Sequence, residues 1–284
     1  MSGLDDWVYY NHAVIPSIEP KQNIDVKPLK DGSIWNFGGH KPLLARYTTD
    51  FDCGCITEWY YTIKDTNYDL TILPSKKKYN INKGRKCFAI KLIKPTDFSH
   101  ELAEVCEDAF KGYSDIYNIK FSLSDCIDEI ESGKWDKSFV FAAFSNQNNK
   151  LCGFYRVGVK GKAIELIQLK VIREYEKLRI NYALVDGVLT YFSEQLKSGY
   201  YITNGCRNLY HKTGFNELLC ENFGFRKAYC NLHIVYRPIV NIGIQIMYLF
   251  RRYINSISNK SPFLYKISAI LEMERIARKC KNTK

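Results

Sequence analysis

The stretch that decides the fold runs from Ile164 to Pro238. It opens with IELIQLKVI at 164–172, continues with REYEKLRINYALVDGVL at 173–189, and closes with NELLCENFGFRKAYCNLHIVYRP at 216–238. The first segment has the apolar character of a strand, and the second is a turn followed by apolar residues at helical spacing. The third predicts a helix that runs into a Gly-Phe corner and a last strand. We therefore expect a strand, a turn and a helix, and then a second strand at 200–205 and a second helix.

The residues upstream of this stretch predict antiparallel strands and short helices. The run from 139 to 172 contains three strand-like segments separated by NQNN and KGK, which is typical of an antiparallel meander. At 99–111, apolar residues recur on one helical face. The first 45 residues predict loops that join short strands. We also expect strands at 58–65 and 87–93, a helix that begins at Pro74 and ends near Gly84, and helices at 124–135 and 181–199.

The composition is that of a globular chain with a basic bias. The 284 residues are 46% hydrophobic and 25% charged, and the formal net charge is +11. We therefore expect an ordered protein whose charge favours phosphate-bearing partners. Ten cysteines are scattered without the spacing of a disulfide framework, which favours a reducing cytoplasm. Cys53 and Cys55 lack a second pair or a nearby histidine, so we expect no metal site.

The two ends of the chain bear on localisation. The start, MSGLDDWVYY, carries two acids and lacks the basic and apolar regions of a signal peptide. The longest uncharged apolar run, 238–250, has 13 residues, whereas a membrane-spanning helix needs about 20. We therefore expect a cytoplasmic protein.

After Pro238 two apolar stripes predict two amphipathic helices with a basic tail. Such helices either pack on the core or lie in the headgroup region of an anionic membrane, which would place the protein peripherally on the inner membrane face. The basic residues beside the stripes are Arg251, Arg252, Arg275, Arg278, Lys279, Lys281 and Lys284.

The chain resembles the GNAT superfamily of acyltransferases, and within it the Fem-type (FemAB-like) branch, whose members acylate amines on cell-envelope precursors. Three blocks in the same order carry the resemblance: YYTIKDTNYDLTILPSKKKYNINKGRKCFAIKLI at 60–93, YEKLRINYALVDGVL at 175–189 and TGFNELLCENFGFRKAYCNLHIVYRP at 213–238. The resemblance covers about half of the chain, residues 55–95 and 139–238.

The resemblance implies an α/β (α+β) fold with a central mixed, mostly antiparallel sheet flanked by helices. It also implies three parts. These are an abbreviated N-terminal lobe at 1–95 with a basic helix at 76–86, a GNAT-like acyltransferase domain at 96–238, and C-terminal amphipathic helices at 239–284.

In this family the turn after the strand holds the phosphates of the acyl donor with backbone N–H groups and a helix N-terminus. Residues 171–184 match that turn, but Glu-Lys-Leu-Arg-Ile-Asn at 176–181 stands where glycines are usual. The donor therefore stays open between acyl-CoA, which the modest length favours, and aminoacyl-tRNA, which the missing glycines favour. The residues that the resemblance assigns to the donor are Gln168, Lys170, Val171, Lys177, Arg179, Asn181 and Asn208.

Acyl transfer to an amine needs a base, a polarised carbonyl and a proton for the leaving group. The resemblance implies that the strand at 164–170 diverges from its neighbour at 200–204, and in that gap Glu165 or His211 would act as base and Tyr210 as proton donor. A half-buried strand glutamate and a lone surface histidine are the ordinary alternatives. On the acceptor side, a phosphate would meet the basic helix, unless that helix is a solvated charged face. The basic residues concerned are Lys76, Lys77, Lys78, Lys83 and Arg85.

The leading hypothesis is an N-acyltransferase that moves an acyl or aminoacyl group onto an amino group of a phosphate-bearing envelope glycan or peptide precursor. One alternative is an acetyl-CoA-dependent N-acetyltransferase of a small or sugar amine. Another is a basic membrane- or RNA-associated protein without catalytic activity on a degenerate GNAT scaffold, because a fold does not certify an activity.

Overall fold

The computed structural model describes residues 4–117, 120–209 and 214–282. The chain divides into two compact units. The first comprises residues 1–62, 206–214 and 227–284, and the second comprises 63–205 and 215–226. These units do not follow the sequence boundaries at 95 and 238, because the basic helix and the strand after it belong with the second unit and the C-terminal helices belong with the first.

The strands form a mixed sheet flanked by helices, which confirms the expected fold class. In the described residues the sheet has ten strands in the order β1-β2-β3-β10-β4-β9-β8-β7-β6-β5. Five of the seven described pairings are antiparallel, so the sheet is mostly antiparallel. The strands are β1 (Trp7–Tyr10), β2 (Ala13–Pro16), β3 (Leu44–Thr49), β4 (Trp59–Lys64), β5 (Phe88–Ile93), β6 (Phe139–Ser145), β7 (Leu151–Lys160), β8 (Ala163–Val171), β9 (Tyr201–Cys206) and β10 (Arg226–Tyr236).

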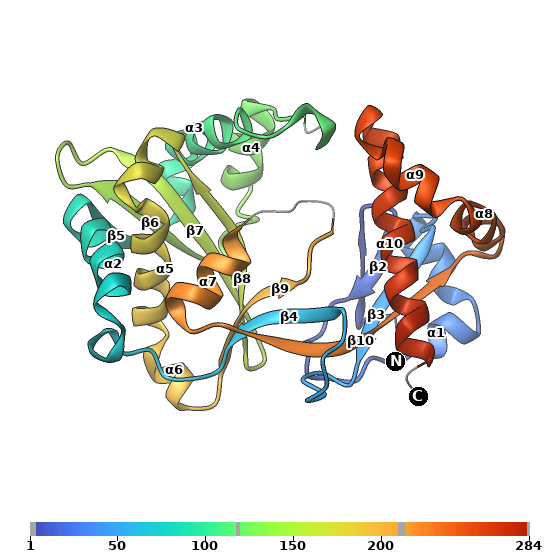
Figure 1. Cartoon of the computed structure of the whole chain (residues 1–284). Helices are drawn as coiled ribbons and strands as arrows, with labels where there is room; N and C mark the ends of the chain where they lie inside the picture. Colours follow the sequence, from blue (N-terminus) through green and yellow to red (C-terminus); the bar gives the residue numbers. More distant parts are fainter. Residues whose placement is uncertain (1–3, 118–119, 210–213, 283–284) are drawn as a thin grey trace. The chain divides into compact units, whose positions relative to one another are not determined.

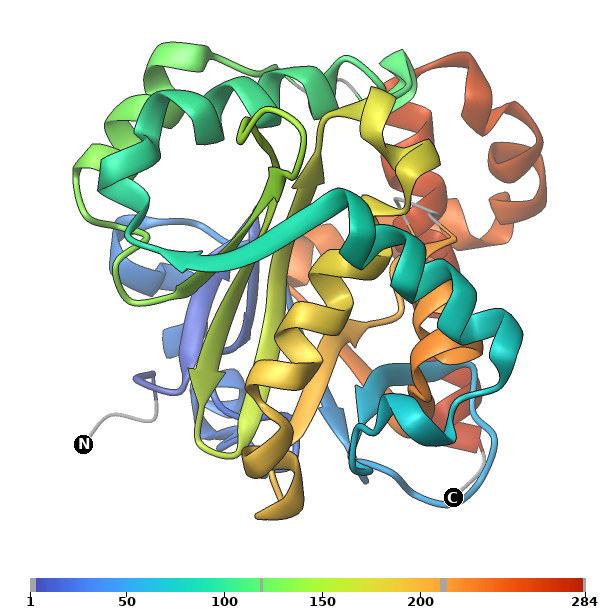
Figure 2. The same ribbon diagram turned by 90° about the vertical axis from the view of Figure 1, so that its left-hand side faces the viewer.

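In the second unit, helices cover both faces of β5–β8 (Figure 2). On one face α2 (Ser75–Cys87) and α5 (Ile180–Tyr191) pack over a core that includes Phe88, Ile164 and Leu184. On the other face α3 (Ser99–Phe110) and α4 (Leu123–Glu131) pack over a core that includes Phe154. The remaining helices of this unit are α6 (Ser193–Lys197) and α7 (Phe215–Phe223).

In the first unit, the last helix of the chain packs against the sheet. Helix α10 (Pro262–Asn282) contributes Ile276, Ala277 and Cys280 to a core with Trp59 and Leu232. Helices α8 (Pro238–Leu249) and α9 (Arg251–Ile257) precede α10 and are drawn beside it in Figure 1. The short helix α1 (Lys27–Lys30) precedes β3.

The periodic segments form the predicted elements, with one break, and α2 continues to Cys87, past the end expected near Gly84. The meander at 139–172 is β6, β7 and β8, and the helix at 99–111 is α3. The helix expected at 181–199 is interrupted at Phe192, which lies between α5 and α6 with a non-helical φ of −93° and ψ of 16°. Phe192 is buried in the core of the second unit. Phe192 lies four residues after Val188 and four before Leu196, which are buried in the same core, so the apolar face continues across the break.

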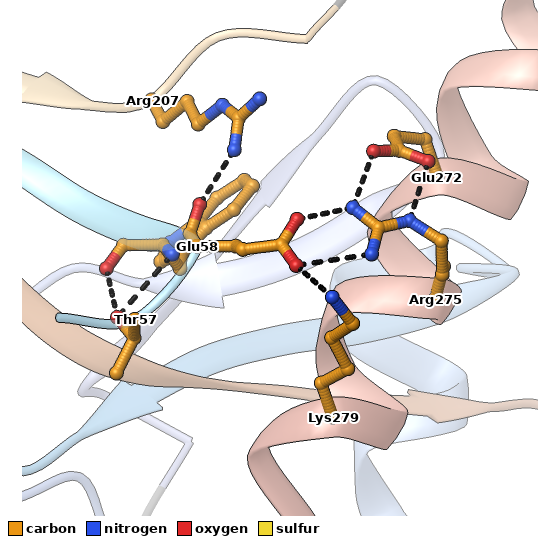
Figure 3. A network of polar contacts seen from close by, with 7 residues as sticks. Thr57, Glu58, Arg207, Glu272, Arg275 and Lys279 are labelled. Atoms are coloured by element: carbon orange, nitrogen blue, oxygen red, sulfur yellow. Dashed lines mark hydrogen bonds and ion pairs between the residues drawn. The ribbon is translucent and has the colours of Figure 1, made fainter.

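A network of charged residues in the first unit connects α10 to the start of β4 (Figure 3). Arg275 Nη1 donates to a Glu58 carboxylate oxygen at 3.0 Å, and Arg275 Nη2 and Lys279 Nζ also bind this carboxylate. Arg275 additionally donates to both carboxylate oxygens of Glu272, at 2.9 Å and 2.7 Å. Arg207 Nη1 donates to the backbone oxygen of Glu58 at 2.7 Å. Arg275 and Lys279, two of the cations considered for a membrane, are therefore paired within the protein.

Acidification should weaken this network. The hydrogen bonds from Arg275 and then from Lys279 lower the pKa of Glu58 to about 2, from an ordinary value of 4.5. Glu58 thus contributes stability that is complete above its ordinary pKa and is lost as the pH falls from 4.5 toward 2. The Glu58 side chain is 34% exposed. We therefore expect Glu58→Gln to lower the free energy of unfolding at neutral pH by only about 1 kcal/mol.

Urea denaturation of both proteins at a series of pH values checks this expectation. The difference between wild type and Glu58→Gln should shrink below pH 4.5. Glu217→Gln is the matched control, because Glu217 is exposed and has no ion pair among the described residues. A difference between wild type and Glu58→Gln that stays constant down to acid denaturation would contradict the role of the carboxylate charge.

Candidate functional site

The central feature of the second unit is the separation of two parallel strands. Strands β8 and β9 pair only at Ala163–Tyr201, Ile164–Ile202 and Glu165–Thr203. Beyond that point β8 continues to Val171 while still paired with β7, and the two strands diverge in Figure 1. The backbone groups on the β9 side of residues 166–171 therefore have no strand partner in β9. Such groups are suited to bind a ligand's carbonyl or amide, because unpaired backbone N–H and C=O groups seek partners.

An irregularity in β8 lies beside this separation. Val157 pairs with Leu166 and Arg156 pairs with Gln168, so Ile167 is an extra residue that forms a bulge. Side chains alternate along a strand, and Ile164 and Leu166 point into the core under α5. Glu165 therefore points to the opposite face. The bulge resets the alternation, so that Gln168 also points to that face, where its Nε2 lies 4.0 Å from Cys106 Sγ of α3.

Two cations lie on the same face, toward α3. Lys170 is 8% exposed, and its Nζ donates to Tyr113 Oη at 3.0 Å and lies 3.9 Å from the Phe110 ring centroid. Arg156, the β7 partner of Gln168, lies over the Trp135 ring with its Cζ 4.5 Å from the centroid. The Nε of Arg156 is buried and has no hydrogen-bond partner in the described chain. Burial lowers the pKa of Arg156, and Glu129 partly opposes this shift. Neither cation has a carboxylate within ion-pair distance among the described residues.

The turn after β8 reaches a helix start without glycine. A 3₁₀ turn, η5 (Arg173–Leu178), leads to Arg179, whose φ of 68° and ψ of 34° are left-handed, and α5 begins at Ile180. Arg179 thus adopts the conformation that glycine would adopt most easily. Its guanidinium is exposed, with Cζ 5.7 Å from the Tyr182 ring centroid. Asn181 lies in the first turn of α5, and its Oδ1 is buried without a partner in the described chain.

The basic helix α2 packs against this turn. A Cβ built on Gly84 would lie 2.7 Å from the backbone oxygen of Arg179, so only glycine permits this approach. Arg85 then reaches Asp186 on α5, with Nε–Oδ2 at 2.6 Å and Nη2–Oδ1 at 2.9 Å. Tyr68 Oη donates to Asp186 Oδ1 at 2.7 Å. The hydrogen bonds that Arg85 donates to Asp186 raise the pKa of Arg85, and burial raises the pKa of Tyr68.

The basic residues of α2 therefore divide into two kinds. Arg85 is held by a buried carboxylate and fastens α2 to α5, so the phosphate role expected for it from the sequence competes with this ion pair. Lys78 Nζ donates to the backbone oxygen of Thr71 at 2.5 Å. The remaining cations, Lys76, Lys77 and Lys83, are exposed or half-buried and have no ion pair among the described residues. These cations belong to the helix that packs on α5, whereas Glu165 points to the α3 face.

The other predicted residues lie in different parts of the chain. Val171 is buried in the core, so only its backbone faces the gap, and Lys177 is exposed in η5. Asn208 is exposed and belongs to the first unit. Tyr210 and His211 lie outside the described residues. Of the three predicted catalytic residues, the structure places Glu165 alone, half-buried at the last pair before the strands separate.

Sequence reasoning missed two groups at this site. The first is Arg156, whose signal is a charged residue inside the apolar strand segment 151–159. The second is the pair of side chains that bind Asn204 at the end of β9, which are Asn216 and Tyr155. Asn204 Nδ2 donates to Asn216 Oδ1 at 2.8 Å, and Tyr155 Oη donates to Asn204 Oδ1 at 3.5 Å. Burial raises the pKa of Tyr155 well above its ordinary value, so this phenol keeps its proton.

Metal binding finds no support in the described part of the chain, which contains no group of three or more His, Cys, Asp or Glu side chains that could hold an ion. Cys53 and Cys55 have sulfurs 3.2 Å apart on an exposed loop, without further ligands. Within the described residues no helix is both long enough and apolar enough to cross a bilayer.

Known proteins resemble this chain in structure only. No family model matches it, and no curated protein matches it by sequence. L-PGS from Bacillus licheniformis is 14% identical with a TM-score of 0.47, over 81% of this chain and 79% of that chain. The C-terminal domain (DUF2156) of a putative lysylphosphatidylglycerol synthetase from Agrobacterium fabrum is 10% identical with a TM-score of 0.49, over 84% and 82%. FemX is 9% identical with a TM-score of 0.48, over 84% and 82%. At these identities and scores the fold assignment rests on the strand order and register described above.

Proposed function

We propose that this protein is an acyltransferase that moves an acyl or aminoacyl group from a phosphate-bearing donor to an amino group. The observation that carries the proposal is the separation of β8 from β9 after the Glu165–Thr203 pair, beside the bulge at Ile167. Unpaired backbone N–H groups in such a gap can polarise an acyl carbonyl and stabilise the oxyanion that forms when an amine attacks it. The partners in this gap are main-chain groups, so they remain in place whatever the side chains are.

The donor is proposed to bind on the α5 side of the gap. A helix N-terminus attracts anions through its unpaired N–H groups and its dipole. Lys177 and Arg179 directly precede α5, and Lys83 adjoins Gly84, which contacts Arg179. Lys76 and Lys77 lie about two turns earlier on α2 and are exposed or half-buried. The packing of Gly84 against Arg179 favours a donor role for the cations of α2, in place of the acceptor role expected from the sequence. Both acyl-CoA and aminoacyl-tRNA carry the phosphates that such a surface would bind.

The acceptor is proposed to bind on the α3 side. Glu165 points to this face and would take the proton of the attacking amine, directly or through water. Arg156 and Lys170 add two cations without carboxylate partners among the described residues, which favours an acceptor that carries an acidic group. An amino-bearing glycan or peptide precursor of the cell envelope has both groups.

Steady-state kinetics with a panel of acyl-CoA donors and charged tRNAs, and with amino-sugar and peptide acceptors, tests the proposal. Arg179→Gly is the informative variant, because glycine keeps the left-handed turn and removes the charge. A charged hydrogen bond contributes about 1.5 to 3 kcal/mol, so KM for the donor should rise about tenfold to a hundredfold, with kcat little changed. Stabilisation by CoA would identify an acyl-CoA enzyme, and a salt-sensitive complex with RNA would identify the tRNA-dependent alternative.

Lys197→Gln is the control, since it removes one charge from α6, at the end of the α5–α6 segment remote from the turn. It should leave KM for the donor unchanged. No turnover with any donor of the panel, together with no binding of CoA or tRNA, would overturn the proposal. That negative result would instead favour a protein that has this fold but no transferase activity.

A further inference from the structure

The segment that forms α8, α9 and the start of α10 exposes an unusual amount of apolar surface. Seven of the nineteen exposed large hydrophobic residues in the described chain lie between positions 239 and 263, and each is 56% to 78% exposed. They are Ile239, Ile242, Ile246, Leu249, Phe250, Tyr253 and Phe263. We call this set the apolar stripe. Scattered exposed apolar residues are ordinary, whereas seven within 25 consecutive positions are a candidate interaction surface.

The four members of the stripe that belong to α8 occupy one side of this helix, and its opposite side packs on the protein. Val240, Ile244 and Met247 pack into the core of the first unit. At about 100° per residue, these three positions lie within about 60° of one another on the helix circumference, and the α8 members of the stripe centre about 150° away from them. Helix α8 is thus apolar on two sides, of which the protein covers one. A helix that only packed on the core would carry polar residues on its outer side.

The charges around the stripe are all of one sign. From Pro238 to Leu271 the chain contains no Asp or Glu, and its charged residues are Arg251, Arg252, Lys260 and Lys266. Arg252, Lys260 and Lys266 are exposed and have no ion pair among the described residues. Farther along α10, by contrast, Arg275 and Arg278 are paired with Glu272 and Glu274. The unpaired cations therefore gather where the apolar surface is exposed.

We propose that the apolar stripe and these cations dock the protein onto the surface of an anionic lipid bilayer. Large apolar side chains enter the acyl boundary while Arg and Lys reach the headgroups, which is the arrangement of a helix that lies in the membrane interface. The described helices are too short or too polar to span a bilayer, so the contact is peripheral. The uniform positive charge favours lipid over a second copy of the chain, since two such surfaces facing one another would repel.

The test measures binding of the full chain to sedimenting vesicles made either of phosphatidylcholine alone or of phosphatidylcholine mixed with phosphatidylglycerol. We expect binding to the anionic vesicles that weakens as salt is added, and much weaker binding to the neutral ones. Neutralising Arg252, Lys260 and Lys266 with glutamine should weaken binding on the order of a hundredfold, since each cation near an anionic surface contributes about fivefold.

A matched pair of double variants tests the apolar part. Ile239→Glu/Ile246→Glu places two charges in the stripe, and Ile56→Glu/Ile72→Glu makes the same chemical change at two exposed isoleucines outside it. The first should bind anionic vesicles at least tenfold more weakly than the second, because only the first loses apolar burial in the bilayer. Both should unfold at the same temperature as wild type, since all four side chains are exposed.

Three results would overturn the inference. The first is equal binding of the two double variants, and the second is equal binding to neutral and anionic vesicles. The third is a dimer in light scattering that Ile239→Glu/Ile246→Glu converts to a monomer, because a second copy would then cover the stripe. Vesicle binding needs neither donor nor acceptor, so this test stands apart from that of the transferase activity.

Discussion

Replacement of Asp186 by alanine is expected to lower the free energy of unfolding by about 3 kcal/mol, at the lower end of the range for breaking a buried ion pair. Asp186 is 4% exposed and holds both Arg85 and Tyr68. Without the carboxylate, the Tyr68 hydroxyl loses its partner and the Arg85 guanidinium loses its counter-charge. Because the Arg85 side chain is 45% exposed, it can turn toward water, and this limits the loss of stability.

Urea denaturation of a double-mutant cycle measures this effect. Asp186→Ala, Arg85→Met and the combined variant should show a coupling energy of at least about 1 kcal/mol, as residues in direct contact usually do. Tyr68→Phe should cost about 1 kcal/mol, the usual value of one hydrogen bond. A loss below about 1 kcal/mol for Asp186→Ala would mean that α2 is held on α5 by its apolar contacts alone.

Gly84→Ala is expected to destabilise the protein by about 1 to 3 kcal/mol, the usual cost of overpacking. The added Cβ would lie 2.7 Å from the Arg179 backbone oxygen and 3.1 Å from Ala183 Cβ, so α2 or the turn must move. The same change normally stabilises a helix by about 1 kcal/mol, and the expected loss is therefore the net of two opposing effects. Displacement of the turn should also raise KM for the donor.

The control is Gly243→Ala in α8, where a Cβ would meet nothing within 4 Å. Here we expect the free energy of unfolding to rise by about 0.5 to 1 kcal/mol. The added methyl group meets no neighbour, and alanine favours a helix more than glycine does. Thermal and urea denaturation of both variants decide the comparison. If Gly84→Ala were as stabilising as Gly243→Ala, close packing between α2 and α5 would be disproved.

Local pattern predicts the elements of this chain well where one face of an element is buried. The segment at 139–172 contributes side chains to two cores, and three strand-like runs separated by short polar turns leave little choice but a meander. Helix α3 likewise follows its apolar face. The break at Phe192 was not predictable in this way, because Val188, Phe192 and Leu196 keep the spacing of a continuous helix across it.

The site was harder to predict because its parts depend on contacts between distant residues. Arg85 and Asp186 are 101 positions apart, so the lysine- and arginine-rich segment gave no sign that Arg85 forms an ion pair within the protein. The bulge at Ile167 depends on the register of β7 against β8. The missing glycines of the turn suggested an altered donor site, yet Arg179 adopts the left-handed conformation itself. The absence of glycine from this turn therefore does not prevent a left-handed residue there.

The position of β4 in the sheet has a consequence for biosynthesis. Residues 59–64 lie between β9 and β10, which are encoded about 140 and 165 positions later, whereas β5 to β8 pair with neighbours close in sequence. A chain emerging from the ribosome can complete the local meander early, but WYYTIK stays unpaired until β9 has been made and keeps one open edge until β10 has been made. Unpaired strands of this kind are prone to aggregate. The yield of folded protein should therefore depend on how well β4 is shielded during synthesis.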